Sequence, residues 1–114
     1  MKNSQIRKLR RKAAESQGWQ CFYCEQPMWD SDPKDFSTRY RVPERAALVF
    51  RCTAEHLQAR SDGGRDSEKN IVAACQHCNN KRHRSKRPKD ADDFLIYVRS
   101  RMKKGRWHSV RPTF

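Results

Sequence analysis

The chain has 114 residues, of which 35% are hydrophobic and 34% are charged, so it has material for only one small core. Lys and Arg number 26 against 13 Asp and Glu, and the resulting net charge of +13 favours a polyanionic partner. No stretch is long and apolar enough to span a bilayer, and the N-terminal segment lacks the apolar centre of a signal peptide. Composition therefore argues against a membrane protein and favours a cytoplasmic protein that binds nucleic acid.

The first predicted element is a basic helix over residues 4–17, inside an N-terminal region of residues 1–18. Ser4 is placed to cap this helix, and Gly18 is placed to end it. Its basic side chains are Arg7, Lys8, Arg10, Arg11 and Lys12. We interpret them as an arm that contacts phosphate groups, with an ordinary solvated helix face as the alternative.

Residues 19–87 are predicted to form the central domain. It opens with a tight turn at a pair of cysteines and continues through a connecting loop over residues 30–45, which are rich in proline, serine and charge. The apolar run 46–54 then predicts a strand that leads directly into the adjacent pair Glu55 and His56.

A second strand and a helix complete this domain. Residues 57–69 are polar and predict a loop, in which Gly63 and Gly64 allow backbone angles that other residues resist. Residues 70–74 predict the strand, and the helix after it carries a second cysteine pair. The basic residues of this helix and of the segment that follows it are Lys81, Arg82, Arg84, Lys86 and Arg87. We assign them to phosphate contacts as well.

Residues 88–114 are predicted to form a C-terminal helix and tail. Asp90 can cap the helix, which should run to about Lys104 and use its apolar face for packing. The tail is expected to be ordered only where Trp107 or Phe114 docks on the rest of the chain.

The cysteines predict a structural zinc site. Their number is five, which argues against a complete disulfide framework. Two Cys-x-x-Cys pairs supply the four thiolates of a closed tetrahedral site, namely Cys21, Cys24, Cys75 and Cys78. Cys52 is left over, on the first predicted strand, and we expect it to be a buried small hydrophobic residue.

The residues between the cysteine pairs are of the types that phosphodiester hydrolysis needs. The reaction calls for a divalent metal that stabilises negative charge and for a base that deprotonates water near neutral pH. Glu55 and Asn79 offer oxygen ligands of the kind that magnesium prefers, and His56 offers the base.

Taken together, several short segments resemble an HNH endonuclease over roughly residues 20–84. The matching residues are Cys21, Cys24, Glu55-His56-Leu57, the segment 59–64, Asn70-Ile71-Val72 and the segment 75–81. The resemblance implies a small α+β protein with the ββα-metal fold, stapled by structural zinc and flanked by N- and C-terminal helices.

The resemblance also implies residue roles. His56 matches the histidine that deprotonates the attacking water, and Glu55 and Asn79 match the ligands of a catalytic Mg²⁺ or Mn²⁺. Asn70 matches the asparagine that braces the loop so that the histidine points at the scissile phosphate. The four paired cysteines match the zinc ligands of one subset of the family.

Two positions depart from the usual family pattern. Ala59 stands where many relatives have proline, and Asn79 replaces a histidine, which suits magnesium or manganese. His83 would share the helix face of Asn79 and is a candidate additional metal ligand, although we prefer a phosphate contact for it. His77 is expected to face solvent or to contact phosphate.

The function implied by the resemblance is metal-dependent DNA endonuclease activity in a bacterial or phage-encoded protein. A single site per chain predicts nicking, whereas double-strand cleavage would require a homodimer, a larger nuclease or packaging complex, or a second encounter. The alternative is a non-catalytic zinc module that binds nucleic acid or serves as a subunit of a larger nuclease. RNA remains an alternative substrate.

Overall fold

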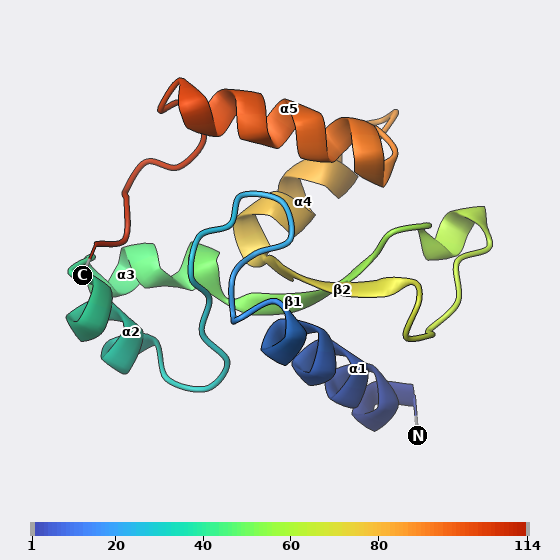
Figure 1. Cartoon of the computed structure of the whole chain (residues 1–114), viewed down its shortest axis with the longest axis horizontal. Helices are drawn as coiled ribbons and strands as arrows, with labels where there is room; N and C mark the ends of the chain where they lie inside the picture. Colours follow the sequence, from blue (N-terminus) through green and yellow to red (C-terminus); the bar gives the residue numbers. More distant parts are fainter. Residues whose placement is uncertain (1, 114) are drawn as a thin grey trace.

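The computed structural model describes residues 2–113, without the side chains of residues 2 and 3, and confirms a small α+β fold. Figure 1 shows a two-stranded hairpin with α1 against one face and α4 against the other, and α5 beyond α4. In chain order the elements are α1 (Lys2–Ser16), α2 (Pro33–Tyr40), α3 (Glu44–Ala47), the 3₁₀ helix η1 (Leu48–Phe50), β1 (Cys52–His56), the 3₁₀ helix η2 (Arg60–Asp62), β2 (Ile71–Cys75), α4 (Gln76–Arg84) and α5 (Ala91–Lys103).

The hairpin and the helix that follows it form the ββα unit that positions the site. β1 and β2 are antiparallel, with Cys52 opposite Cys75 at one end and His56 opposite Ile71 at the other. Helix α4 begins directly after β2, and the backbone N–H of Gln76 donates to the carbonyl of Arg51 at 2.9 Å. Chain direction therefore reverses abruptly, so the first turn of α4 lies beside the start of β1.

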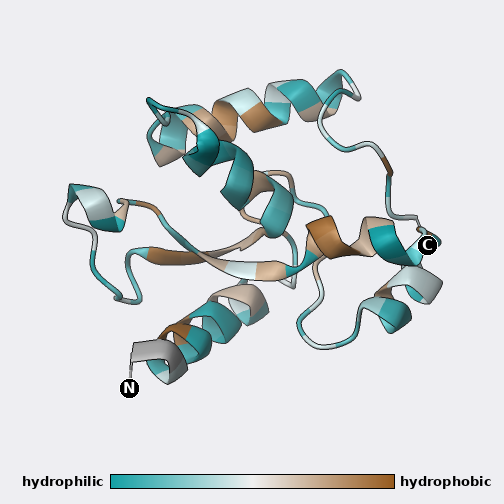
Figure 2. Cartoon of the chain, turned by 180° about the vertical axis from the view of Figure 1, so that it is seen from behind, coloured by the Kyte–Doolittle hydropathy of each residue, from teal (hydrophilic) through white to brown (hydrophobic). Residues whose placement is uncertain are grey.

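The main core surrounds the cysteine pairs. It joins the hairpin to the buried face of α1, through Ala14, and to the buried face of α5, through Phe94 and Val98. Cys52 is also fully buried there, as expected for a small apolar side chain. Figure 2 shows hydrophobic residues along the hairpin, whereas α1 and α4 are mainly hydrophilic.

The prediction of a loop over residues 30–45 is wrong, because much of this segment forms the helix α2. The side chain of Asp32 accepts hydrogen bonds from the backbone N–H groups of Lys34 and Asp35, and Pro33 occupies the first turn. These are strong helix-start signals. Arg41 ends the helix in the left-handed conformation at φ 57°.

The strand expected over residues 46–54 is wrong in its first half. Residues 44–50 are helical, as α3 and η1, and the strand begins at Cys52. Their apolar side chains enter a second small core with α2, which consists of Phe36, Val42, Ala47 and Phe50. Helical geometry serves this packing because Ala47 and Phe50, three positions apart, then point the same way.

Both terminal helices are present as predicted, except that α1 begins at Lys2, so Ser4 lies inside the helix and does not cap it. Gly18 follows α1 at φ +65°, and the side chain of Asp90 caps α5 by accepting from the N–H of Asp93. In the tail, Trp107 packs against the main core, whereas Phe114 lies outside the described residues. None of the helices within residues 2–113 has the length and apolar character that crossing a membrane requires.

Candidate active site and metal centres

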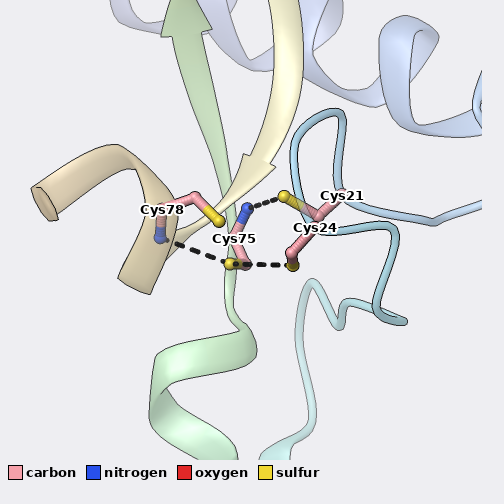
Figure 3. A group of neighbouring side chains, drawn as sticks. All are labelled: Cys21, Cys24, Cys75 and Cys78. Carbon is pink, nitrogen blue, oxygen red and sulfur yellow. Dashed lines mark hydrogen bonds between the residues drawn. The ribbon is translucent and has the colours of Figure 1, made fainter. Parts of the chain in front are cut away.

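The two cysteine pairs meet in one buried cluster (Figure 3). Cys21 and Cys24 come from the turn after α1, Cys75 ends β2, and Cys78 lies in the first turn of α4. The four sulfur atoms lie within 4.8 Å of one another, and Cys24 Sγ is 3.8 Å from Cys75 Sγ. Tetrahedral zinc with bonds of about 2.3 Å requires sulfurs about 3.8 Å apart. The cluster could therefore hold a metal such as zinc.

Charge in this cluster also fits a metal. Burial opposes ionisation of Cys21, yet hydrogen bonds from the other three cysteines outweigh it and lower the pKa of Cys21 well below its ordinary value. The pKa of Cys78 is raised by burial and by its hydrogen bond to Cys21. Four buried sulfurs this close to one another could all ionise only around a cation.

The C-terminal tail covers the cysteine cluster. Trp107 Nε1 donates to Cys78 Sγ at 3.3 Å, and His108 Nε2 lies 3.3 Å from Cys24 Sγ. His77 packs edge-to-face on Trp107, and its Nε2 is buried without a hydrogen-bond partner among the described residues. The prediction that His77 faces solvent or phosphate is therefore wrong. Burial and, secondly, the charge of Lys81 lower the pKa of His77.

Glu55 lies in the interior, with a side chain only 1% exposed. Its Oε2 accepts from the Tyr23 hydroxyl and from Arg82 Nη1, both at 2.8 Å, and its Oε1 accepts from His83 Nε2 at 2.8 Å. Burial and the Glu55 charge raise the pKa of Tyr23 far above its ordinary value, so the phenol remains a hydrogen-bond donor. The carboxylate therefore has three donors and one buried counter-ion.

His56, the next residue along β1, faces the loop instead. Its Nε2 is 2.7 Å from Asp66 Oδ1, and Arg60 Nη2 contacts both oxygens of Asp66 at 3.2 Å. Hydrogen bonding to His56, together with Arg60, lowers the pKa of Asp66. Because a carboxylate accepts hydrogen bonds, we assign a proton to Nε2, which places the acceptor lone pair on Nδ1. Arg60 Nε, 3.3 Å from the same Nε2, then approaches the ring without a hydrogen bond to it.

Asn70 holds the loop between the strands closed. Its Oδ1 accepts from Gln58 N at 2.8 Å, and its Nδ2 donates to the carbonyls of Gln58 and Arg65 at 3.0 and 2.9 Å. Gly64 lies at the closest approach within this loop, where a Cβ atom would sit 1.7 Å from the Gln58 carbonyl oxygen. Asn70 thus ties together the two ends of this loop, and Gly64 lies where a side chain would not fit.

Asn79 and His83 lie one turn apart on α4, beside the end of β1. Asn79 Nδ2 donates to Thr53 Oγ1 at 3.0 Å and to the Ala54 carbonyl at 3.1 Å, which leaves its Oδ1 as the open ligand atom. His83 is one third exposed and reaches Glu55. Glu55 Oε1 and the His83 ring therefore lie together, and Asn79 lies one turn earlier on the same helix. Carboxylate, amide and imidazole are ligand types that suit Mg²⁺ or Mn²⁺.

Two of the predicted phosphate contacts are unavailable. Arg82 is 5% exposed, and besides Glu55 it donates to the carbonyls of His56, Leu57 and Lys89. Arg10 is held against Asp30 at 2.7 Å and donates to the Cys52 carbonyl. Both guanidinium groups are therefore structural, because long-range partners bury them. The other predicted basic contacts are exposed, although Arg11 and Lys12 pair with acids: they are Arg7, Lys8, Arg11, Lys12, Lys81, Arg84, Lys86 and Arg87.

An open cleft of about 730 Å³ lies between α1 and β1. Basic residues of α1 line one side, and Arg51, Thr53, Ala54 and Gln76 line the other. Arg51 was not among the predicted contacts, because a lone arginine in an apolar run carries no sequence signal of its position. Thr53 and Ala54 are also the partners of Asn79, although the proposed metal ligands do not line this cleft, because α4 lies on the opposite face of the hairpin.

Comparison with known families agrees with this geometry. Residues 45–85, which span α3 to α4, match the family model described as HNH endonuclease. This match supports a nuclease-type function and implies a nucleic-acid substrate. No curated protein and no solved structure matches the chain.

Three partners of the candidate site, in the matched segment and beside it, were not predicted from the sequence. Tyr23 lies between the first two cysteines, where it reads as ordinary packing. Asp66 and Arg60 lie in the polar loop, among several other charged residues. Only the folded loop shows that Asp66 contacts His56.

Proposed function

We propose that this protein is a metal-dependent DNA endonuclease that hydrolyses phosphodiester bonds. The observation that carries the proposal is the arrangement at the end of β1, inside the segment that matches the HNH family model. There Glu55 and His56 are adjacent, His83 of α4 reaches Glu55, and Asn79 of α4 donates to the Ala54 carbonyl. A module that only binds nucleic acid has no need for an oriented imidazole beside a carboxylate and an amide.

His56 acts as the general base in this proposal. Asp66 holds Nε2–H, so that Nδ1 is free to take the proton of a water molecule, and the Asp66 charge stabilises the imidazolium that results. Arg60 keeps Asp66 in place through its two contacts with the carboxylate. Asn70 fixes the loop on which Asp66 and Arg60 lie.

Glu55, Asn79 and His83 would hold the catalytic metal, through Glu55 Oε1, Asn79 Oδ1 and the His83 ring. Mg²⁺ or Mn²⁺ bound there would supply stabilisation of the negative charge that develops on the phosphate and the leaving oxygen. Arg82 offsets part of the Glu55 charge. We therefore expect the affinity for the metal to be modest.

The basic residues would position the nucleic acid. The cleft between α1 and β1 carries Arg7, Lys8, Arg11 and Arg51, and it leads toward the partners of Asn79. Lys81, Arg84, Lys86 and Arg87 are exposed in and after α4. Contacts from such side chains to phosphate fix the register of a nucleic acid without reading its sequence.

The four-cysteine site would hold structural zinc. It has no open coordination position once four thiolates are bound, so it would stabilise the fold and take no part in hydrolysis. Its location between the turn after α1, β2 and α4 would clamp the ββα unit against both flanking helices.

The test is incubation of supercoiled plasmid with purified protein and Mg²⁺, Mn²⁺ or EDTA. We expect metal-dependent nicking that falls by about 10²–10⁴-fold in His56→Ala, because general-base catalysis contributes about that much. Glu55→Gln should also be inactive, whereas Glu44→Gln, which alters an exposed glutamate of α3, should cleave normally. Zinc content and circular dichroism confirm that the variants fold.

Cleavage that survives His56→Ala would contradict the assigned mechanism. Absence of cleavage with every metal, together with salt-dependent binding of the same plasmid, would instead identify a nucleic-acid-binding module. Matched DNA and RNA duplexes at one ionic strength would establish which nucleic acid is preferred.

A further inference from the structure

Tyr23 joins the four-cysteine cluster to the site at the end of β1. It lies between Cys21 and Cys24 in the chain, in the turn that supplies two of the four sulfurs. Its hydroxyl donates to Glu55 Oε2 at 2.8 Å, across 32 positions of sequence. The backbone of Tyr23 therefore belongs to the turn at one proposed metal centre, and its hydroxyl belongs to the other.

The position of Tyr23 is tightly determined. The residue is fully buried, and its ring makes edge-to-face contacts with Phe94 at 4.9 Å and with Phe22 at 5.2 Å. Its own backbone carbonyl accepts from Arg99 of α5 at 3.1 Å. The hydroxyl has little freedom to move unless the turn that carries it moves.

Tyr23 also decides which oxygen of Glu55 remains for a metal. Oε2 is held by the Tyr23 hydroxyl and by Arg82 Nη1, so the carboxylate cannot rotate without breaking both bonds. Oε1 then points to α4, where it meets His83. Without the Tyr23 hydrogen bond, Arg82 would be the one remaining donor of this pair to Oε2. The Glu55 carboxylate would then be held less firmly in its orientation.

We propose that Tyr23 is a positioning residue that couples the four-cysteine site to the affinity of Glu55 for a divalent metal. The proposal rests on the proposed function, because it takes Glu55 as a ligand of the catalytic metal. Binding of one ion by Cys21 and Cys24 fixes the turn between them. The turn fixes the Tyr23 hydroxyl, and the hydroxyl fixes Glu55. A metal ion in the four-cysteine site thus raises the affinity of the Glu55 site for a divalent metal.

The experiment measures Mn²⁺ affinity of the zinc-loaded protein by the electron paramagnetic resonance signal of free Mn²⁺, with no nucleic acid present. Tyr23→Phe keeps the buried ring and removes only the hydroxyl. We expect it to keep one zinc per chain by native mass spectrometry and to bind Mn²⁺ about tenfold more weakly, which is typical for loss of a hydrogen bond to a metal ligand. Tyr97→Phe is the matched control, because its ring also packs on Phe94, and it should bind normally.

A Tyr23→Phe protein that binds Mn²⁺ as tightly as wild type would overturn the proposal, while the proposed nuclease function would stand. Failure of that function has a different signature, namely equal Mn²⁺ binding by wild type and Glu55→Gln. A role in packing alone would lower stability and zinc retention without the selective change in Mn²⁺ affinity.

A second measurement covers the case in which Tyr23→Phe does not retain zinc. One equivalent of Co²⁺ in the cysteine site of the otherwise unmodified protein gives absorption bands that report the geometry of the thiolates. Coupling is reciprocal, so saturating Mg²⁺ should shift these bands in wild type and in Tyr97→Phe but leave them unchanged in Glu55→Gln. If Mg²⁺ did not shift these absorption bands in wild type, the proposal would be overturned.

Discussion

Glu55 and His56 are neighbours on β1, yet the molecule holds them in different ways. The Glu55 side chain is 1% exposed, and its partners come from the turn after α1 and from α4. The His56 side chain is 15% exposed, and its ring contacts Asp66 and Arg60 of the loop after β1. Alternation along a strand sends one side chain inward and the next outward. The metal-ligand side of the site is thus part of the core, whereas the base side depends on a polar loop.

This difference has consequences for the size of mutational effects. A buried charge that loses its partner costs several kcal/mol, because the charge cannot be solvated. A contact between exposed charges contributes little, because water and salt screen it. Changes around Glu55 should therefore affect folding, while changes around His56 should affect mainly activity.

The largest effect is expected for Arg82→Ala. This change leaves Glu55 buried without its counter-ion and removes donors to the carbonyls of His56, Leu57 and Lys89. We expect a loss of about 3–5 kcal/mol in the free energy of unfolding, measured by urea denaturation of the zinc-loaded protein.

Arg84→Ala is the control for this experiment, because Arg84 is exposed on the same helix, and its effect should stay within about 0.5 kcal/mol. Adding Glu55→Gln to Arg82→Ala should recover part of the stability, since the uncompensated charge is then gone. Equal urea midpoints for Arg82→Ala and Arg84→Ala would show that the buried pair does not support the fold.

An intermediate effect is expected for Gly64→Ala, which acts on the base side alone. The new Cβ would lie 1.7 Å from the Gln58 carbonyl oxygen, so the backbone of the loop must shift. A shift of about 1 Å in the groups that orient His56 can cost about 100-fold in rate. Plasmid nicking should fall by about this factor, whereas Mn²⁺ affinity should not change.

Gly63→Asn serves as the control in the same loop. Gly63 has φ +89°, and asparagine tolerates the left-handed region better than other residues with a side chain. This variant should retain most of the activity. If Gly64→Ala weakened Mn²⁺ binding as much as it slowed nicking, the claim that the loop around His56 acts independently of the metal ligands would be incorrect.

The smallest effect is expected for Asp66→Asn. The amide still accepts a hydrogen bond from His56 but has no charge, and at this partly buried pair the change should lower the nicking rate by about fivefold. The pKa of Asp66 is below its ordinary value. The carboxylate is therefore fully ionised at any pH above that ordinary value, and its contact with His56 is lost only when the pH falls below the lowered pKa. The two proteins should therefore be compared at pH 8, where the Asp66 carboxylate is charged. Equal nicking rates at that pH would show that the Asp66 charge does not support the base.

Elements with strong local signals could be predicted from the sequence. As predicted, Gly18 follows the C-terminal end of α1, and Asp90 caps the N-terminal end of α5. The helix α2 carried equally good signals in Asp32 and Pro33, but the charge and proline content of its surroundings favoured a loop. Residues 46–50 could not be assigned locally, because a short apolar run fits a strand or a buried helix equally well.

For the candidate site, the sequence identified the residues that carry chemistry but not the contacts that hold them. Cys21, Cys24, Cys75 and Cys78 were predicted to converge, and they do. Arg82 and Lys81 are adjacent basic residues of one helix, yet one is buried against Glu55 and the other is exposed. Helix rotation against the hairpin determines this difference, and it depends on packing across the whole domain.

The sequence by itself determined the charge of the protein, its two Cys-x-x-Cys pairs and the order of the residues that match the HNH pattern, because spacing and residue type are local properties of the chain. Only the tertiary structure decided that Tyr23 and Arg82 hold Glu55, that Asp66 holds His56, and that α1 and β1 enclose a basic cleft. These pairs are separated by 10 to 32 positions or by whole elements. Their meeting follows from burial of the common core, which no local pattern records.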